Sequence, residues 1–316
     1  MTGLNAGHVG IAGEVRCIVK REDGSTKEDT GFQKNLILNQ GLDFFGGGKG
    51  VDIFASCAIG SGNAVPAHTQ TQLSSFLAIT TGTQSSIKYD YVPDASNLYK
   101  TNKVYKYIFT GLNNANVSEV GLVSQGTTST NYYLCTRALL KDATGTPTTI
   151  TVLLGETLEV YYKLWKIVSV LDASYTVNML DGKGGITPYN CIIRPYNVGS
   201  SSNEIGNNAT DISFNQTWFS SLDLSPITSG LPKQDDANST VAITPYVAGT
   251  YKLQVQSKIT TAQANRNIRM IGVTSRFINY QCRFGSVAGD NPIPKTSLQT
   301  LSTAFEFSWG RYEGVL

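Results

Sequence analysis

The sequence predicts an all-β protein, and three features carry this prediction. Several stretches alternate apolar and polar residues, which is the period of a strand with one buried face. The chain is also divided at short intervals by turn-forming residues, with 31 glycines and 10 prolines among 316 residues. Finally, the second half of the chain repeats a pattern of the first. Together these features predict two β-sandwich domains, of jelly-roll or immunoglobulin-like type, related by an internal duplication.

The clearest alternation lies in residues 158–164. One face of this predicted strand carries Leu158, Val160, Tyr162 and Leu164, and the other carries Glu159, Tyr161 and Lys163. The same period runs through residues 251–259 and 305–309. Each of these stretches is therefore expected to bury one face and expose the other.

Other elements follow from turn signals and short apolar runs. Residues 16–27 predict a strand that enters a turn, because Asp23-Gly24 follows a β-branched run. Residues 31–45 predict a strand and then a short helix that ends before the glycine-rich residues 46–50. Further strands are predicted from apolar runs at residues 54–59, 105–109, 117–123, 132–140 and 149–165.

The internal repeat sets the expected domain boundaries. Asn116-Val-Ser-Glu-Val-Gly-Leu-Val-Ser124 is echoed by Asn267-Ile-Arg-Met-Ile-Gly-Val-Thr-Ser275. Each copy continues with a Tyr-x-Cys, at residues 133–135 and 280–282, and then a proline 14 residues after the tyrosine. Each copy closes on a strand that contains a tryptophan. We expect an N-terminal domain at 1–166, a linker at 167–185 and a C-terminal domain at 186–316, with polar loops at 199–209 and 225–240 as places for binding.

Aromatic residues supply the candidate interface positions. Trp165 and Trp309 occupy equivalent places in the two repeats and are predicted to be equivalent core or interface anchors, with Tyr161 and Tyr162 beside the first. Other dense aromatic groups lie at residues 89–91 and 105–107. Core packing and cross-strand pairing explain most such residues, while protein contacts and glycan stacking are the alternatives.

Composition excludes several classes of function. Only 15% of the residues are charged, the net charge is +2, and no run of Lys or Arg forms a basic face, so a nucleic-acid partner is not expected. No apolar run approaches the roughly 20 residues of a membrane span, and the N-terminus has no apolar signal region. We therefore expect a soluble protein made in a cytoplasm, with no membrane insertion.

Catalytic and metal-binding patterns are absent from the sequence. His8 and His68 match no nucleophile or metal motif, and the glycines at 46–50 lack the Lys-Ser/Thr ending of a phosphate loop. The acidic pairs at 22–23, 28–29 and 235–236 lack calcium-ligand spacing and are expected to be solvated turns. We expect no enzyme activity, cofactor or metal.

The five cysteines have no C-x-x-C spacing, so buried free thiols are expected. Disulfides from Cys57 to Cys135 and from Cys191 to Cys282 are geometrically conceivable, on the symmetry of the repeat alone. A cytoplasmic site of synthesis disfavours them.

A series of stretches resembles structural tail proteins of tailed bacteriophages. In chain order they are residues 35–43 (NLILNQGLD), 57–66 (CAIGSGNAVP) with 70–73 (QTQL), 118–122 (SEVGL), 137–142 (RALLKD), 146–153 (TPTTITVL) and 158–162 (LEVYY). The resemblance covers about residues 30–165 and carries no catalytic residues. It implies a β-rich virion protein of the tail, collar, baseplate or fibre-attachment region.

The function expected from these features is assembly. The chain is expected to form homo-oligomers through symmetric β-rich contacts and to bind other tail or head-tail connector proteins of the virion. A host-receptor or polysaccharide-binding module is the alternative, with the host surface as a further partner. A capsule-degrading enzyme is disfavoured because the sequence has no obvious acidic cluster from which to draw paired carboxylates.

Overall fold

A computed structural model describes residues 4–46, 53–88, 97–181, 183–198, 214–232, 236–238, 241–275 and 279–316. Strands make up 57% of the structure and helix 3%, which confirms the all-β prediction. The predicted polar loop at 199–209, the aromatic group at 89–91, most of the glycine run at 46–50 and Asp235 lie outside the described residues.

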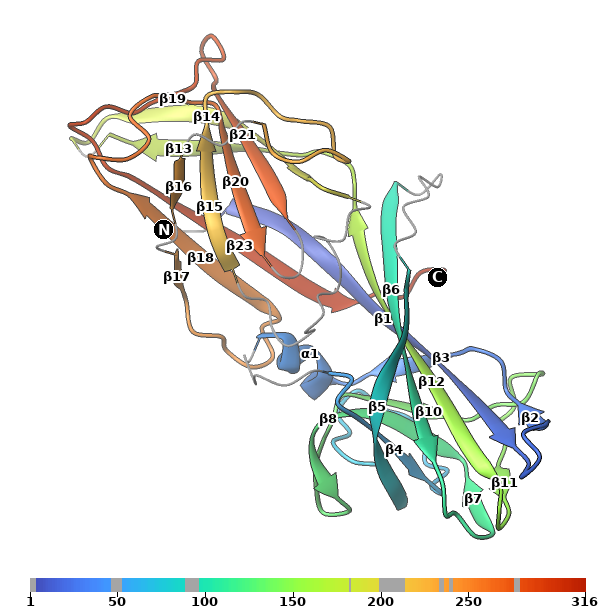
Figure 1. Ribbon diagram of the computed structural model, residues 1–316. Coiled ribbons are helices and arrows are strands. Elements are labelled where there is room, and N and C mark those ends of the chain that lie inside the picture. The colour runs from blue at the N-terminus through green and yellow to red at the C-terminus, as the bar shows by residue number, and fades with distance from the viewer. Residues whose placement is uncertain are drawn as a thin grey trace.

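The N-terminal half forms a closed eight-stranded barrel (Figure 1). Around the barrel the strands are β1 (Leu4–Lys20), β3 (Gln33–Ile37), β10 (Thr136–Leu139), β8 (Glu119–Thr128), β4 (Ser56–Gly60), β5 (Phe76–Lys88), β6 (Leu98–Phe109) and β12 (Thr157–Ser169), which pairs back to β1. Added to it are β2 (Thr26–Asp29) on β1, β9 (Asn131–Leu134) on β8, the small pair β7 (Ala115–Val117) and β11 (Ile150–Val152), and helix α1 (Asn39–Gly46).

The C-terminal half has two main groups of strands. One is a six-stranded sheet in the order β13 (Ala173–Leu180), β14 (Ile186–Pro195), β21 (Tyr280–Ser286), β20 (Met270–Ser275), β15 (Phe214–Ser220) and β16 (Asp236–Asn238). The other continues the sheet of the barrel through β23 (Leu301–Arg311), β18 (Lys252–Ile259) and β17 (Val241–Ile243). A short pair, β19 (Asn267–Ile268) and β22 (Ile293–Pro294), lies at the end far from the barrel (Figure 1).

Strand β1 belongs to both halves. Residues 9–20 pair antiparallel with β12 in the barrel, while residues 4–11 pair parallel with β23. At about 3.3 Å per residue its 17 residues span roughly 55 Å, which is long enough to cross from one half to the other. Gly7 on this strand lets the ring of Tyr280 pack where a Cβ would stand, so β1 also contacts the six-stranded sheet.

The expectation of two β-sandwich domains is therefore not confirmed. The N-terminal half is a closed barrel, and a single strand contributes to the sheets of both halves. The expected linker at 167–185 contains the end of β12 and all of β13. Alternation in the sequence reports which face of a strand is buried, but not which strands pair, and so it does not distinguish a sandwich from a barrel.

The local predictions about strand faces are confirmed. In β12, Leu158, Val160, Tyr162 and Leu164 are all 0% exposed, and the intervening side chains are half-buried. The strands β18 and β23 show the same alternation, and their inward side chains complete the core of the C-terminal half. The predicted hairpin is formed by β1 and β2, with Gly24 in its turn at φ 81°, and the predicted strand and short helix are β3 and α1.

The two halves share an order of antiparallel pairing. In the first half the order is β1-β3-β10-β8-β4, and in the second it is β13-β14-β21-β20-β15. The echoed Asn116 and Asn267 both lie in short strands, which pair with β11 and β22 respectively. The halves differ at closure, because β12 pairs with β1 whereas β23, the strand of the second half that contains a tryptophan, does not pair with β13.

Candidate functional site

Two of the four predicted anchor residues are core residues. Tyr162 is 0% exposed inside the barrel, and Trp309 is 2% exposed in the C-terminal half. The indole Nε1 of Trp309 donates a hydrogen bond of 2.8 Å to the carbonyl of Leu42 in α1, and its ring lies 5.5 Å from that of Tyr246. Trp309 thus packs the C-terminal half against the helix of the N-terminal half. Both Tyr162 and Trp309 are too buried in this structure to contact a partner protein.

The other two anchor candidates lie on the outside of the barrel. Trp165 is half-buried, and its Nε1 donates to Glu14 Oε2 at 2.8 Å. The Tyr161 hydroxyl donates to Glu159 at 3.0 Å, and Lys106 Nζ lies 5.5 Å from the Tyr161 ring. The two tryptophans lie on opposite sides of β1, in unlike surroundings.

Cations join these outer aromatic side chains into a row. Lys163 Nζ lies 5.4 Å from the Trp165 ring, 3.9 Å from the Phe32 ring and 3.1 Å from Glu14 Oε2. Lys106 forms an ion pair of 2.6 Å with Glu159, and this hydrogen bond raises the pKa of Lys106. The charges of this row are paired within the protein, so the surface that it presents is largely neutralised.

A fully buried ion pair lies at the point where the stretches of sequence resemblance meet. The side chains of Glu119 in β8 and Arg137 in β10 are both 0% exposed, with 2.7 Å between Arg137 Nη2 and Glu119 Oε2. Arg137 also donates to Gln70 Oε1 and Ser74 Oγ, each at 2.9 Å. Glu119 accepts hydrogen bonds from the backbone N–H groups of Gly62, Ser74 and Ser75.

This network fixes the segment between β4 and β5 onto the barrel. Its charged groups bond to one another and to the backbone of that segment, so the arrangement is structural rather than a site for substrate. Sequence reasoning missed it, although Glu119, Arg137 and Gln70 all lie in stretches that carry the resemblance. The signal available was a pair of opposite charges in otherwise apolar strands.

Strand β13 is an edge of the six-stranded sheet. It pairs with β14 through all eight residues, and no other described strand pairs with it. None of its residues is charged, and Tyr175 and Leu180 are 38% and 70% exposed. Native proteins normally protect a long edge strand with charges, proline or a covering element, and β13 has neither charges nor proline.

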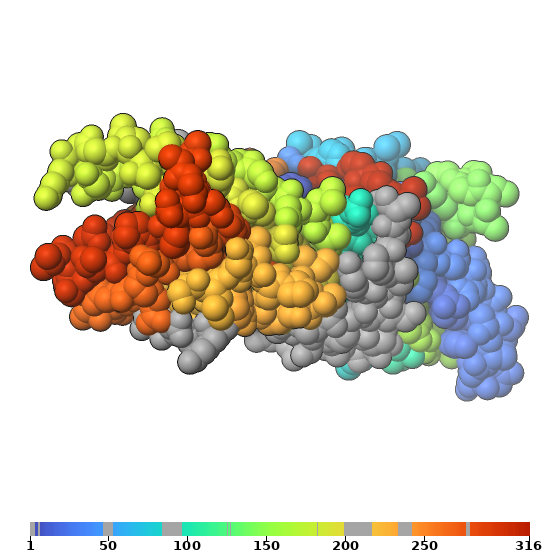
Figure 2. Space-filling model, turned by 90° about the horizontal axis from the view of Figure 1, so that it is seen from above, coloured from blue at the N-terminus to red at the C-terminus, as the bar shows by residue number. Residues whose placement is uncertain are grey.

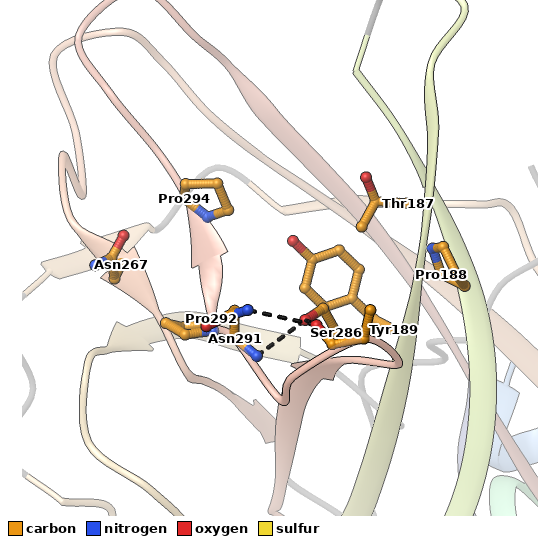
Figure 3. Close-up of a pocket in the computed structure, with 9 residues that line it drawn as sticks. Thr187, Pro188, Tyr189, Asn267, Ser286, Asn291, Pro292 and Pro294 are labelled. Carbon is orange, nitrogen blue, oxygen red and sulfur yellow. Dashed lines mark hydrogen bonds between the residues drawn. The ribbon is translucent and has the colours of Figure 1, made fainter.

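A hollow of about 530 Å³ opens at the end of the C-terminal half that lies far from the barrel. In Figure 2 it separates the end of the yellow-green hairpin of β13 and β14 from the orange-red segments late in the chain. Figure 3 shows its lining. Thr187, Pro188 and Tyr189 come from β14, Asn267 from β19 and Pro294 from β22. Ser286 is the last residue of β21, and Asn291 and Pro292 lie between β21 and β22. No lining residue is charged.

The rim of this hollow is held by its own hydrogen bonds. Ser286 Oγ accepts from the backbone N–H of Asn291 at 2.9 Å and donates to the carbonyl of Ala288 at 2.8 Å. Neighbouring charges are paired outside the lining, because Asp290 binds Arg283 at 2.6 Å and Arg269 at 3.3 Å. The hollow therefore has an uncharged wall, and hydrogen bonds hold the turn on one side of it.

The described residues offer little reactive chemistry. All five cysteines are buried free thiols, and burial raises the pKa values of Cys17, Cys135 and Cys191 to about 12. Across the described ranges, no group of three or more His, Cys, Asp or Glu side chains could hold a metal ion. In the same ranges, no helix has the length and apolar character needed to cross a membrane.

Comparison with known proteins finds no matching family model, no matching curated protein and no matching solved structure.

Proposed function

We propose that this protein is a structural component of a bacteriophage tail that assembles with copies of itself, through β-strand pairing at β13. The observation that carries the proposal is the edge of β13, an uncharged strand of eight residues with apolar side chains exposed beside it. An open edge presents unpaired backbone N–H and C=O groups to a strand from another chain. The phage assignment is supported by the sequence resemblance over residues 30–165.

The internal duplication supports the choice of partner strand. We infer that the halves are duplicated units, because five strands in each have the same order of antiparallel pairing. In the first unit the counterpart of β13 is β1, which has an antiparallel neighbour on each side in β3 and β12. In the second unit the place of β12 beside β13 is taken by no described strand.

The β13 strand of a second copy of the protein is the partner that we propose for this unpaired edge. Symmetric oligomers most often use the same surface on both subunits, and an uncharged strand meets its own copy without like-charge repulsion. The half-buried Val177 and Met179 contact the core from this edge, so an added strand would cover their remaining exposed surface. Other tail or head-tail connector proteins are the further partners proposed, with the virion tail as the location.

Light scattering on the purified full-length protein tests this proposal. We expect the wild-type protein to form a defined oligomer and Thr176→Lys to lower its mass, because a lysine on the edge disfavours pairing. Thr81→Lys is the matched control, since Thr81 is an exposed threonine on β5, which has neighbours on both sides. A wild-type monomer at every concentration, or an oligomer unchanged by Thr176→Lys, would contradict edge pairing.

Negative-stain imaging with purified phage tails tests the location. We expect the wild-type oligomer to dock on a tail particle at a fixed position. Failure to bind any tail component, together with binding to host cells, would favour the receptor-binding alternative instead.

A further inference from the structure

The hollow at the far end of the C-terminal half has the features of a ligand site. Its volume of about 530 Å³ falls within the range of roughly 300–1,000 Å³ that is common for small-molecule pockets. It is bounded by elements that lie far apart in the sequence, with β14 on one side and β19 and β22 on the other (Figure 3).

Tyr189 gives this hollow a specific polar group. The residue is only 5% exposed, yet its hydroxyl points into the hollow in Figure 3. No other described residue donates a hydrogen bond to this hydroxyl or accepts one from it. The hydroxyl is not among the buried side-chain atoms that lack a partner, so it reaches the open space of the hollow and is available to a molecule bound there.

Two further lining residues carry groups that can form hydrogen bonds. Asn267 and Thr187 line the hollow, and no described side chain forms a hydrogen bond with the amide of Asn267 or the hydroxyl of Thr187. Hydroxyl and amide groups both donate and accept hydrogen bonds, which matches a ligand that carries several hydroxyl groups. Burial raises the pKa of Tyr189, so its hydroxyl keeps its proton and remains neutral.

The remaining lining selects against charge and provides apolar contact. With no charged residue in the wall, a ligand with a full charge would lose hydration without gaining a counter-charge. The rings of Pro188, Pro292 and Pro294 offer apolar faces around the polar groups. Neutral hydroxyl groups combined with an apolar C–H face are the chemical character of a sugar ring.

We propose that this hollow binds one uncharged sugar unit of a glycan, with hydrogen bonds from Tyr189, Asn267 and Thr187. The inference stands apart from the assembly role, because it rests on other residues than the edge of β13. A monomeric protein that binds sugar and an oligomer that does not are therefore distinguishable results.

The test uses the full-length protein and individual sugars as probes. D-glucose, D-galactose, D-mannose and N-acetyl-D-glucosamine represent neutral units, and N-acetylneuraminic acid is the anionic comparison. Saturation-transfer NMR detects binding, and a titration followed by NMR gives the dissociation constant. We expect at least one neutral sugar to bind and the anionic sugar to bind more weakly.

Tyr189→Phe removes the hydroxyl and keeps the ring. We expect it to weaken binding by roughly three- to tenfold, the loss of one hydrogen bond to the ligand. Tyr175→Phe is the matched control on the exposed edge, and it should bind as the wild type does. Asn267→Ala changes an exposed side chain, so the variant should fold, and it should also weaken binding of the sugar. It replaces Tyr189→Phe in the test if that variant does not fold.

Three results would overturn the inference. One is that no neutral sugar binds, and another is that the anionic sugar binds as tightly as the best neutral one. The third is that a sugar binds to the wild type, Tyr189→Phe and Asn267→Ala with equal affinity, because the binding would then lie elsewhere on the protein.

Discussion

Replacing Glu119 with glutamine tests whether the buried ion pair holds the barrel together. The change keeps the shape of the side chain but removes its charge. Glu119 Oε1 accepts from the N–H groups of Gly62 and Ser75 at 3.0 and 2.8 Å, and Oε2 accepts from Ser74 and from Arg137 Nε at 3.1 and 2.8 Å. An amide has only one oxygen, so its NH₂ group must face two donors at one of these positions.

The expected cost follows from the burial of the pair. Both side chains are 0% exposed, so Glu119→Gln leaves the guanidinium of Arg137 buried without a counter-charge. Breaking a buried ion pair by neutralising one partner destabilises proteins by about 3–5 kcal/mol. We expect a loss of that size in the free energy of unfolding, measured by urea titration and circular dichroism.

The same change should loosen the segment that the network anchors. Hydrogen exchange of residues 61–75 should become faster in Glu119→Gln, because the backbone N–H groups of Ser74 and Ser75 lose part of their acceptor. Glu159→Gln is the matched control on the outer face of the same barrel, where Glu159 pairs with a half-buried lysine. That control should cost less than Glu119→Gln, because both side chains of its ion pair remain partly exposed to solvent. The reasoning is refuted if Glu119→Gln costs no more than Glu159→Gln, or if exchange in residues 61–75 is unchanged.

Three further predictions concern the core and the contact between the halves. Trp309→Ala should lower the free energy of unfolding in urea by about 3–5 kcal/mol, because the Trp309 side chain is 2% exposed. Trp165 is half-buried, so Trp165→Ala should lower it by less than half as much, and equal losses would contradict the different surroundings of the two side chains. Burial raises the pKa of Cys17 from 9.0 to about 12, so the folded state keeps a proton that the unfolded chain loses; this contribution to stability is complete below about pH 9 and falls between pH 9 and pH 12. Urea unfolding at increasing pH should show a shallower fall for Cys17→Ala, and an identical slope would count against the assignment. Tyr246→Phe removes a hydrogen bond of 2.5 Å to Asp43 in α1, and thermal unfolding should show a loss of about 1.5–3 kcal/mol in the free energy of unfolding. An unchanged unfolding midpoint would mean that this contact between the halves does not stabilise the protein.

The sequence by itself determined the class of the fold and the faces of its strands. Alternation in residues 158–164 placed Leu158 and Tyr162 inward, and turn chemistry at Asp23-Gly24 located the first hairpin. These features are local, because a side chain's face depends on the period of its own strand and a turn depends on a few adjacent residues. The repeat was also visible, since it preserves order and spacing along the chain.

Only the tertiary structure decided which strands pair and what their pairing brings together. The closure of the barrel by β12 and the double use of β1 depend on partners at least 137 residues away. The edge of β13 is open because no described strand other than β14 pairs with it. The hollow around Tyr189 also depends on residues that are distant in the sequence, because its walls come from residues 187–189, 267 and 286–294. Many pairings satisfy the same alternation of apolar and polar residues, and packing of the whole core selects among them.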